Sequence, residues 1–198
     1  MNKYPNLVVR SSDINEHLPT LRKYAEQCSH ITEFGVREVV SIWAYLDAGT
    51  KTIRGYDIKE SPNYKDALLY AKANSIDLKF IKADTLKTTI EETEFLFIDT
   101  LHTYQQLLSE LTKHHGYVSK YIGFHDVVTF GYLNEQPGKK IKDYCNLAGE
   151  PQQGLMPAIL EFMYENPEWQ LDYFSKENNG LIKLKNHSLS NTTILVLS

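Results

Sequence analysis

The chain has 198 residues, of which 42% are hydrophobic, and its formal net charge is -4 at pH 7. This size supports one domain with a substantial core and is too small for two ordinary domains, so we expect a single domain over residues 1–198. Acidic and basic residues are mixed along the chain, which argues against the strongly basic surface that nucleic acid or an anionic membrane needs in a partner.

The cysteines and the first residues favour a cytoplasmic protein. Cys28 and Cys145 are the only cysteines, and they lie far apart without metal-ligand spacing, as expected of free thiols in a reducing compartment. The opening MNKYPNLVVRSSD lacks the apolar stretch of a signal peptide, and no run approaches the ~20 apolar residues that span a bilayer.

Helical periodicity alternates with short apolar runs as far as residue 126. Residues 1–30 predict a helical segment, with Ser11, Ser12 and Asp13 as candidate helix caps. The pattern predicts strands at 30–34, 51–58, 77–84, 94–100 and 120–126, and helices at 39–49, 62–76 and 103–116. Such alternation implies parallel strands joined by right-handed crossovers, with helices on both faces, and therefore an α/β fold.

The pattern changes after residue 126. Residues 127–153 are too long and too rich in Gly, Pro and Lys for a simple connection, which is typical of a lid or a substrate loop. A helix then ends at Pro167, and residues 169–186 predict an antiparallel hairpin around an Asn-Asn-Gly turn. The tail, 186–198, is either an edge strand or a frayed end.

An acidic residue stands at the end of each of the five predicted parallel strands. These residues are Glu33, Asp57, Asp84, Asp99 and Asp126. A single aspartate at a strand end is more often a helix cap than a ligand. However, parallel strands present their carboxyl ends at one edge of a sheet, which is where ligands bind. We therefore expect the five acids to converge on one site.

The spacing of these acids is typical of a nucleoside site. Asp57 follows Gly35 by 22 residues, a distance that suits a carboxylate accepting both ribose hydroxyls. The turn EFGVREVV has one glycine where a dinucleotide fingerprint has two or three, and no Walker-type phosphate loop is present. A nucleoside cofactor without phosphate remains, and S-adenosylmethionine fits that description.

Val39 stands where the turn of a nucleotide-binding fold usually has a small residue. We expect Val39 to lie in the following helix, whose backbone a β-branched residue tolerates at a small cost. Its methyl groups are then expected to narrow the cofactor pocket and to weaken affinity without abolishing the fold.

Several stretches resemble class I S-adenosylmethionine-dependent methyltransferases, in particular the branch with sugar and macrolide O-methyltransferases and glycan-associated members. The likeness runs from about Ile31 to Lys185 and includes ITEFGVREVVSIWAYL, GYDI, KADTL and FLFIDTLHTYQQ. Its most specific parts are the block Asp99-x-x-His102-x-Tyr104 and the pair His125-Asp126. It implies a Rossmann-like methyltransferase sheet and transfer of a methyl group to a hydroxyl of a sugar, glycan or small metabolite.

The resemblance also implies cofactor contacts. It places the turn Glu33, Phe34 and Gly35 beside the methionine part of the cofactor, Asp57 on the ribose, Asp84 near the adenine amine, and Asp99 by the cofactor's amino group or a metal.

In that family the histidine of the Asp-x-x-His block is the general base, which here means His102. Histidine suits the role because a hydroxyl must lose its proton before it attacks, and a group with a near-neutral pKa accepts that proton best. The alternative is a helix-terminal surface histidine. His114 and His115, at the far end of the same predicted helix, are expected to be solvated.

Some relatives bind magnesium through carboxylates at the positions of Asp99, His125 and Asp126. This chain has an imidazole at His125, and Mg²⁺ prefers oxygen ligands, so magnesium dependence is the less favoured expectation. Two carboxylates and an imidazole could instead hold a transition metal.

The acceptor, a small molecule or a glycan, is expected to meet the loop 127–153. Its candidate contacts are Phe130, Tyr132 and Tyr144 for stacking, and Lys139, Lys140 and Lys142 for an anionic group. A solvated basic loop is the alternative for the lysines. The alternative for the whole chain is a nucleoside-binding or assembly module descended from methyltransferases, which fold alone does not exclude. Homo-oligomerisation is left open.

Overall fold

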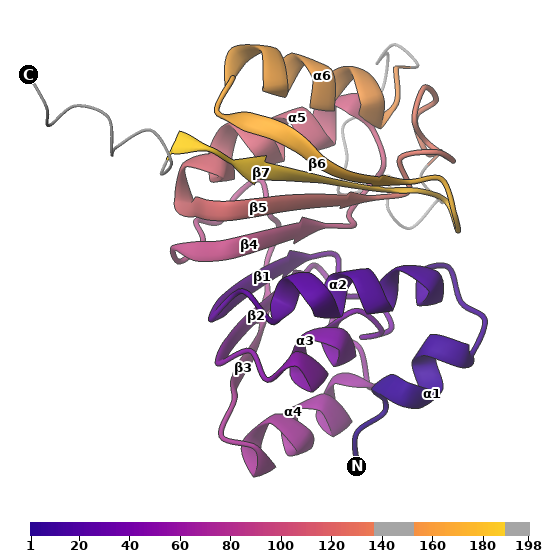
Figure 1. The fold of residues 1–198 in the computed structure, drawn as a ribbon, viewed down its shortest axis with the longest axis vertical. Coiled ribbons are helices and arrows are strands. Elements are labelled where there is room, and N and C mark those ends of the chain that lie inside the picture. Colours follow the sequence, from indigo (N-terminus) through magenta and orange to yellow (C-terminus); the bar gives the residue numbers. More distant parts are fainter. Residues whose placement is uncertain (137–152, 189–198) are drawn as a thin grey trace, which may run out of the picture.

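The computed structural model describes residues 1–136 and 153–188 and contains a seven-stranded sheet in the order β3-β2-β1-β4-β5-β7-β6 (Figure 1). The strands are β1 (His30–Phe34), β2 (Thr52–Asp57), β3 (Asp77–Lys82), β4 (Thr93–Ile98), β5 (Val118–His125), β6 (Trp169–Ser175) and β7 (Leu181–Asn186). The first five pair in parallel, and β7 is antiparallel to both β5 and β6. This confirms the predicted α/β sheet, mostly parallel with a C-terminal antiparallel hairpin.

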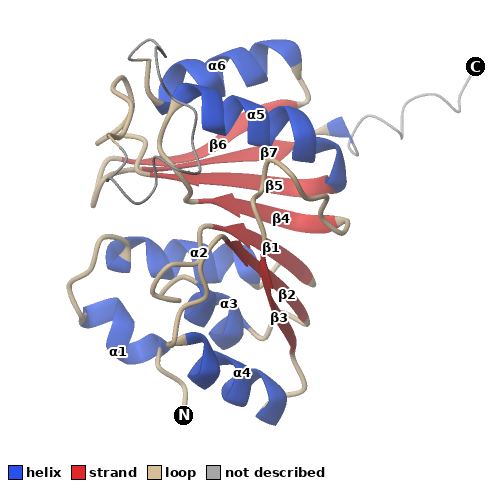
Figure 2. Cartoon of the chain, turned by 180° about the vertical axis from the view of Figure 1, so that it is seen from behind, coloured by secondary structure: helices blue, strands red, loops and turns tan. Residues whose placement is uncertain are grey.

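Helices cover both faces of the sheet (Figure 2). The helices are α1 (Tyr4–Val9), α2 (Leu18–Ala25), α3 (Ile42–Ala48), α4 (Tyr64–Ala73), α5 (Tyr104–His114) and α6 (Leu155–Glu165), with short 3₁₀ turns η1 (Asn15–His17) and η2 (His115–Tyr117). Residues of α2, α3 and α4 share one apolar core with the sheet, and residues of α5 and α6 share a second. The central strand β4 supplies both cores, because Phe95 and Phe97 face the first while Leu96 and Ile98 face the second.

The start of two helices differs from the prediction. The residues Ser11, Ser12 and Asp13 do not cap α2, which begins at Leu18 after η1 and has a proline in its first turn. The helix predicted from Val39 begins only at Ile42. Periodicity missed this boundary because Val39 is fully buried like the apolar face of the helix that follows, although it belongs to the turn.

Val39 adopts a left-handed backbone with φ of 66°, and its side chain packs in the α2–α4 core. It is not among the residues that line the cofactor-sized cavity described below. The expectation that Val39 lies in a helix and narrows that cavity is therefore wrong. The turn has kept the backbone conformation that favours glycine, and the side chain points into the core.

Gly35 joins the end of β1 to the ends of its two neighbours. Its N–H donates to the carbonyl of Tyr56 at 2.9 Å, while the N–H of Asp99 donates to the carbonyl of Phe34 at 2.9 Å. The φ of Gly35 is 84°, and a Cβ at this position would lie 1.9 Å from the carbonyl oxygen of Asp99. Only glycine fits here, because any side chain would collide with the backbone of Asp99, directly after β4.

Parts of the lid and tail predictions lie outside the described residues. Tyr144, Lys139, Lys140, Lys142 and Cys145 are among them, as are residues 189–198. The interpretation of 127–153 as a lid stays a prediction, and so does the single-domain organisation with its N-terminal segment and tail.

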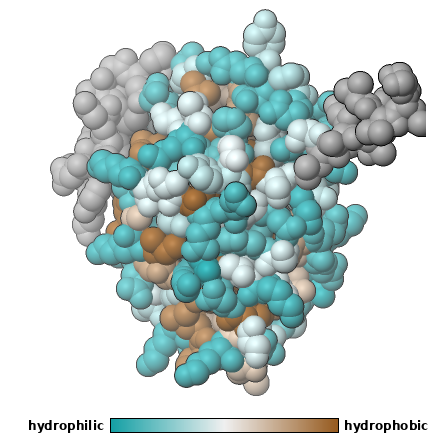
Figure 3. Space-filling model, turned by 90° about the vertical axis from the view of Figure 1, so that its left-hand side faces the viewer, coloured by the Kyte–Doolittle hydropathy of each residue, from teal (hydrophilic) through white to brown (hydrophobic). Residues whose placement is uncertain are grey.

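Within 1–136 and 153–188, no helix is both long and apolar enough to cross a bilayer. The side at the left of Figure 1 is mostly hydrophilic, with hydrophobic side chains in small separate groups (Figure 3).

Gly35→Ala is expected to lower the free energy of unfolding by at least about 3 kcal/mol, because the new Cβ meets backbone that cannot move aside without separating β1 from β4. The matched control is Gly116→Ala, where an added Cβ meets no atom within 4 Å. The control should change stability by less than about 1 kcal/mol. Urea unfolding measures both, and equal stability of the two variants would contradict this account of the turn.

Candidate active site

A cavity of about 430 Å³ opens at the carboxyl ends of β1, β2, β3 and β4. It is lined by Gly35, Arg37, Tyr56, Asp57, Ile58, Ala83, Asp84, Thr85, Leu86, Asp99, Thr100, Leu101, His102, Gln106 and Glu135. Two other hollows, of about 460 and 470 Å³, lie at the amino ends of the parallel strands and contain none of the predicted site residues. The predicted edge of the sheet is therefore where the candidate residues gather, in a volume suited to a small molecule.

The structure brings together four of the five strand-end acids. Asp57, Asp84 and Asp99 line the cavity, and the carboxylate of Asp126 lies 3.1 Å from the Nε2 atom of His102, which lines it too. The fifth acid, Glu33, is fully buried and does not line the cavity. Phe34 is likewise buried in the α5–α6 core. The predicted cofactor contacts of Glu33 and Phe34 thus stay predictions.

Backbone N–H groups fix the carboxylates of Asp57 and Asp84. The N–H of Arg37 donates to Asp57 Oδ2 at 3.0 Å, and the N–H of Lys59 donates to Asp57 Oδ1 at 2.9 Å. The N–H of Leu86 donates to Asp84 Oδ1 at 3.0 Å. Each carboxylate oxygen can accept a further hydrogen bond, so both acids can still receive hydroxyl or amine protons from a ligand.

His102 lies between carboxylates on both sides of its ring. Its Nδ1 donates to Glu135 Oε2 at 2.9 Å, and its Nε2 lies 3.1 Å from both Asp99 Oδ1 and Asp126 Oδ2. The N–H of Glu135 in turn donates to the carbonyl of His102 at 2.8 Å. Phe130 stacks on the ring with a centroid distance of 5.0 Å and an interplanar angle of 3°. The imidazole is thereby held in one orientation at the cavity wall.

These contacts favour the charged forms of the cluster. Burial alone would lower the pKa of His102, but its hydrogen bonds with Asp99 and Glu135 outweigh burial and raise the pKa to about 9. Burial would raise the pKa of Asp99, but hydrogen bonds from His102 and His125 hold it well below its usual range. Opposite charges within hydrogen-bond distance explain both directions.

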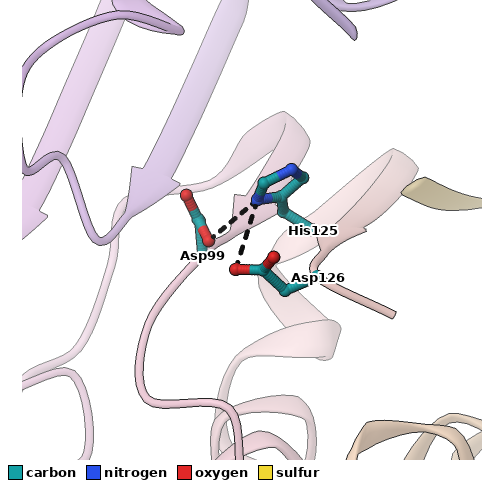
Figure 4. Close-up of side chains that lie close together, drawn as sticks. All are labelled: Asp99, His125 and Asp126. Carbon is teal, nitrogen blue, oxygen red and sulfur yellow. Dashed lines mark hydrogen bonds and ion pairs between the residues drawn. The ribbon is translucent and has the colours of Figure 1, made fainter. Parts of the chain in front are cut away.

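Asp99, His125 and Asp126 form the candidate metal-binding group (Figure 4). One donor atom from each lies within 4.8 Å of the other two, with His125 Nδ1 at 3.3 Å from Asp99 Oδ1 and 3.5 Å from Asp126 Oδ2. Two carboxylate oxygens and one imidazole nitrogen fit a transition ion better than Mg²⁺, which prefers oxygen. The sequence-predicted ligands are thus adjacent, and their donor set is mixed.

Glu33 forms a hydrogen bond with the segment that follows the Gly35 turn. Its Oε1 accepts a hydrogen bond from the hydroxyl of Ser41 at 2.6 Å, while Oε2 has no hydrogen-bond partner among the described residues. Burial raises the pKa of Glu33 to about 8. The residue therefore carries a buried carboxyl group directly behind the cavity's Gly35 turn.

Sequence reasoning missed Glu110, which organises one wall of the cavity. The carboxyl group is fully buried on α5, where Oε1 accepts from Thr85 Oγ1 at 2.6 Å and from Gln106 Nε2 at 2.9 Å. Its Oε2 accepts from Thr100 Oγ1 at 2.8 Å. All three donors line the cavity. A signal existed in the sequence, because Glu110 follows Leu107 of the apolar side by three residues, a spacing that places both on neighbouring parts of the helix surface.

Two other side chains depart from their expected surroundings, and a third contacts α6. His114 is fully buried rather than solvated, and its Nε2 lies 2.8 Å from the carbonyl of Thr85. The hydroxyl of Tyr104 donates to Glu161 Oε2 at 2.5 Å on α6. Phe130 stacks on His102, so that its predicted role against a sugar ring would require the opposite face of the phenyl group.

No family model and no curated protein matches the sequence. Solved structures do match the fold. A proposed caffeoyl-CoA O-methyltransferase from Staphylococcus aureus aligns over 93% of this chain and 88% of its own, with a TM-score of 0.60 and 10% identity. The 1,6-didemethyltoxoflavin-N1-methyltransferase of Burkholderia thailandensis, solved with S-adenosylhomocysteine, aligns over 93% and 84%, with a TM-score of 0.59 and 9% identity.

Magnesium protoporphyrin IX methyltransferase from Synechocystis PCC 6803, also solved with S-adenosylhomocysteine, aligns over 93% of both chains with a TM-score of 0.59 and 9% identity. The chain therefore has the fold of the class I S-adenosylmethionine-dependent methyltransferases, as its resemblance to them implied.

Glu110 is expected to make stability depend on pH. Burial raises its pKa from 4.5 to about 7, so the folded state holds a proton that the unfolded state releases above pH 4.5. Its contribution to stability is therefore complete below pH 4.5 and is lost as the pH rises through about 7. The difference in unfolding free energy between wild type and Glu110→Gln should fall by up to about 3 kcal/mol between pH 5 and pH 8.

Urea unfolding at four pH values in this range tests the prediction. Glu165→Gln, at an exposed position of α6, is the control and should show a constant difference from wild type. The same constant difference for Glu110→Gln would show that Glu110 is ionised in the folded protein at all these pH values.

Proposed function

We propose that this chain is an S-adenosylmethionine-dependent methyltransferase that methylates a hydroxyl group, with His102 as the general base. The observation that carries the proposal is the position of His102. Its ring is fixed by Glu135 and Phe130 at the wall of a cavity that Asp57 and Asp84 also line. The proposed nucleoside ligands and the proposed base thus line one cavity.

Three carboxylates lie along the edge of the sheet, and each suits a different part of the cofactor. Asp57 is held by two N–H groups in a position to accept the ribose hydroxyls, and Asp84 is held by one in a position to accept the adenine amine. Asp99 lies on the His102 side of the cavity. Cofactor-bound neighbours with this fold were solved with S-adenosylhomocysteine, which supports the choice of cofactor.

The cofactor supplies an electrophilic methyl group on a positively charged sulfur. His102 Nε2 would take the proton of the acceptor hydroxyl as that oxygen accepts the methyl group, while Glu135 keeps Nδ1 protonated and the ring oriented. The protonated form of His102, favoured by its carboxylate neighbours, is disfavoured when a sulfonium cation lies nearby, because like charges lower the pKa.

The acceptor is proposed to be a sugar, a glycan precursor or another small hydroxylated metabolite. The proposal rests on the resemblance to sugar O-methyltransferases and on the neighbouring aromatic residues Phe130 and Tyr132. Neighbours with this fold also include a 16S rRNA methylase, so the acceptor panel should contain RNA as well. The cytoplasm, where the cofactor would be available, is the proposed compartment.

Mutation of His102 tests the base. His102→Gln is expected to lower kcat by ~10²–10⁴ because an amide cannot accept the proton of the acceptor hydroxyl. Its affinity for S-adenosylhomocysteine should stay within about threefold of wild type if the ring acts on the acceptor rather than on the cofactor. Radiolabelled methyl transfer to a panel of sugars, nucleotide sugars, phenols and RNA measures kcat, and calorimetry measures binding.

Glu135→Gln separates orientation of the ring from folding. The amide keeps the shape of the side chain but accepts a proton less strongly, so kcat should fall by about tenfold or more with cofactor affinity unchanged.

Full activity of His102→Gln would exclude His102 as the base. Tight cofactor binding by wild type without turnover on the whole panel would instead favour the nucleoside-binding or assembly module.

Asp99, His125 and Asp126 are the residues that would hold a divalent ion, which would act as a Lewis acid on the acceptor oxygen. We expect the reaction to proceed without added magnesium, because one of these three donors is an imidazole nitrogen. Dialysis against a chelator should change kcat by less than about twofold, and added Mg²⁺ should not raise it further. Loss of activity that Mn²⁺ restores and Mg²⁺ does not would identify a transition-metal enzyme and overturn this expectation.

A further inference from the structure

Arg37 differs in charge from the rest of the cavity wall. Of the described residues that line the cavity, Arg37 is the one lysine or arginine, whereas Asp57, Asp84, Asp99 and Glu135 are acidic. An acidic wall matches the ribose hydroxyls, the ammonium group and the sulfonium of the cofactor. It does not match the carboxylate of the methionine portion, which needs a cation or several N–H donors.

Arg37 lies beside the proposed ribose ligand and near the acidic residues around His102. Its N–H donates to Asp57 Oδ2 at 3.0 Å, which places the residue beside the proposed ribose ligand. Its guanidinium group is close enough to Asp99, Asp126 and Glu135 to interact with their charges. Arg37 therefore lies beside the proposed ribose ligand and within electrostatic range of the carboxylates around His102, where the methionine portion would lie.

The ion pair that the guanidinium group of Arg37 forms with Asp13 is weak. Nη1 of Arg37 lies 2.8 Å from Asp13 Oδ2, and the two side chains are 60% and 43% exposed. Ion pairs at this exposure contribute roughly 0–1 kcal/mol. The remaining N–H donors of the guanidinium group can thus form a paired hydrogen bond with a second carboxylate without the loss of a buried contact.

The backbone conformation of Arg37 also needs an explanation. Its φ is 40°, in the left-handed region where glycine is favoured and other residues carry a cost of order 1 kcal/mol. Unlike Val39 in the same turn, Arg37 does not recover this cost by burial, because its side chain is largely exposed. A role for the side chain in binding would account for an arginine at a position that suits glycine.

We propose that Arg37 binds the carboxylate of the cofactor's methionine portion. This inference rests on the proposed function, since it takes S-adenosylmethionine as the ligand. The contact is a charge-assisted pair between the guanidinium N–H groups and the two carboxylate oxygens. It fixes the end of the cofactor that lies furthest from adenine and so sets the position of the sulfur relative to His102.

Two ligands that differ only in the methionine tail test the proposal. S-adenosylhomocysteine carries the carboxylate, and 5′-methylthioadenosine keeps the adenosine and the thioether but lacks the amino-acid group. Calorimetry should show that Arg37→Met weakens S-adenosylhomocysteine at least tenfold and 5′-methylthioadenosine less than twofold. Arg37→Lys should recover part of the loss, because a single ammonium group replaces the paired donors.

The control is Lys82→Met, which removes one positive charge from an exposed position paired with Asp57 in the sheet but outside the cavity lining. It should change the affinity for either ligand by less than twofold. Equal weakening of both ligands by Arg37→Met would assign Arg37 a role in the turn alone and overturn the proposal, as would an unchanged affinity for S-adenosylhomocysteine. If wild type binds neither ligand, the proposed function fails, and the assignment of Arg37 fails with it.

Discussion

The contact between Gly35 and the backbone of Asp99 is the constraint on which the site depends. Because Gly35 has no Cβ, the end of β1 lies directly against the end of β4, where a methyl group would come within 1.9 Å of a carbonyl oxygen. The same turn is hydrogen-bonded to Tyr56 at the end of β2. One close backbone approach thus aligns the ends of three strands, and with them the carboxylates of Asp57 and Asp99.

The reactive side of the cavity depends in turn on charge balance. Asp99 and Asp126 are largely buried, and both contact His102 and His125. Burying two neighbouring carboxylates would cost free energy if no cations lay nearby. The imidazoles of His102 and His125 supply that compensation, and burial of the cluster keeps each ring in one orientation. Asp126 holds a left-handed backbone with φ of 60° to reach this position. Such strain at a polar cluster is typical of a functional site.

The sequence predicted those parts of the site that depend on strand ends. Asp57, Asp84 and Asp99 each stand at or just after the end of a parallel strand, so their convergence follows from parallel pairing alone. Glu135 was not predictable, because it contacts His102 from a segment 33 residues further along the chain and belongs to no periodic element. Glu110 was missed for a different reason. A glutamate in the middle of an amphipathic helix normally faces water, and here three hydrogen-bond donors allow its burial.

The turn after β1 holds two residues other than glycine in a backbone conformation that glycine favours. Arg37 and Val39 both have positive φ, with values of 40° and 66°. Val39 offsets that cost by burying its whole side chain, since full burial of a valine contributes roughly 1.5–3 kcal/mol. Its N–H also donates to the carbonyl of Val36 at 2.8 Å. The contacts of Arg37 within the described part of the chain are its N–H bond to Asp57 and an exposed ion pair. The two residues therefore have different consequences: Val39 strengthens the core on one side of the turn, and Arg37 adds a positive charge to the cavity on the other.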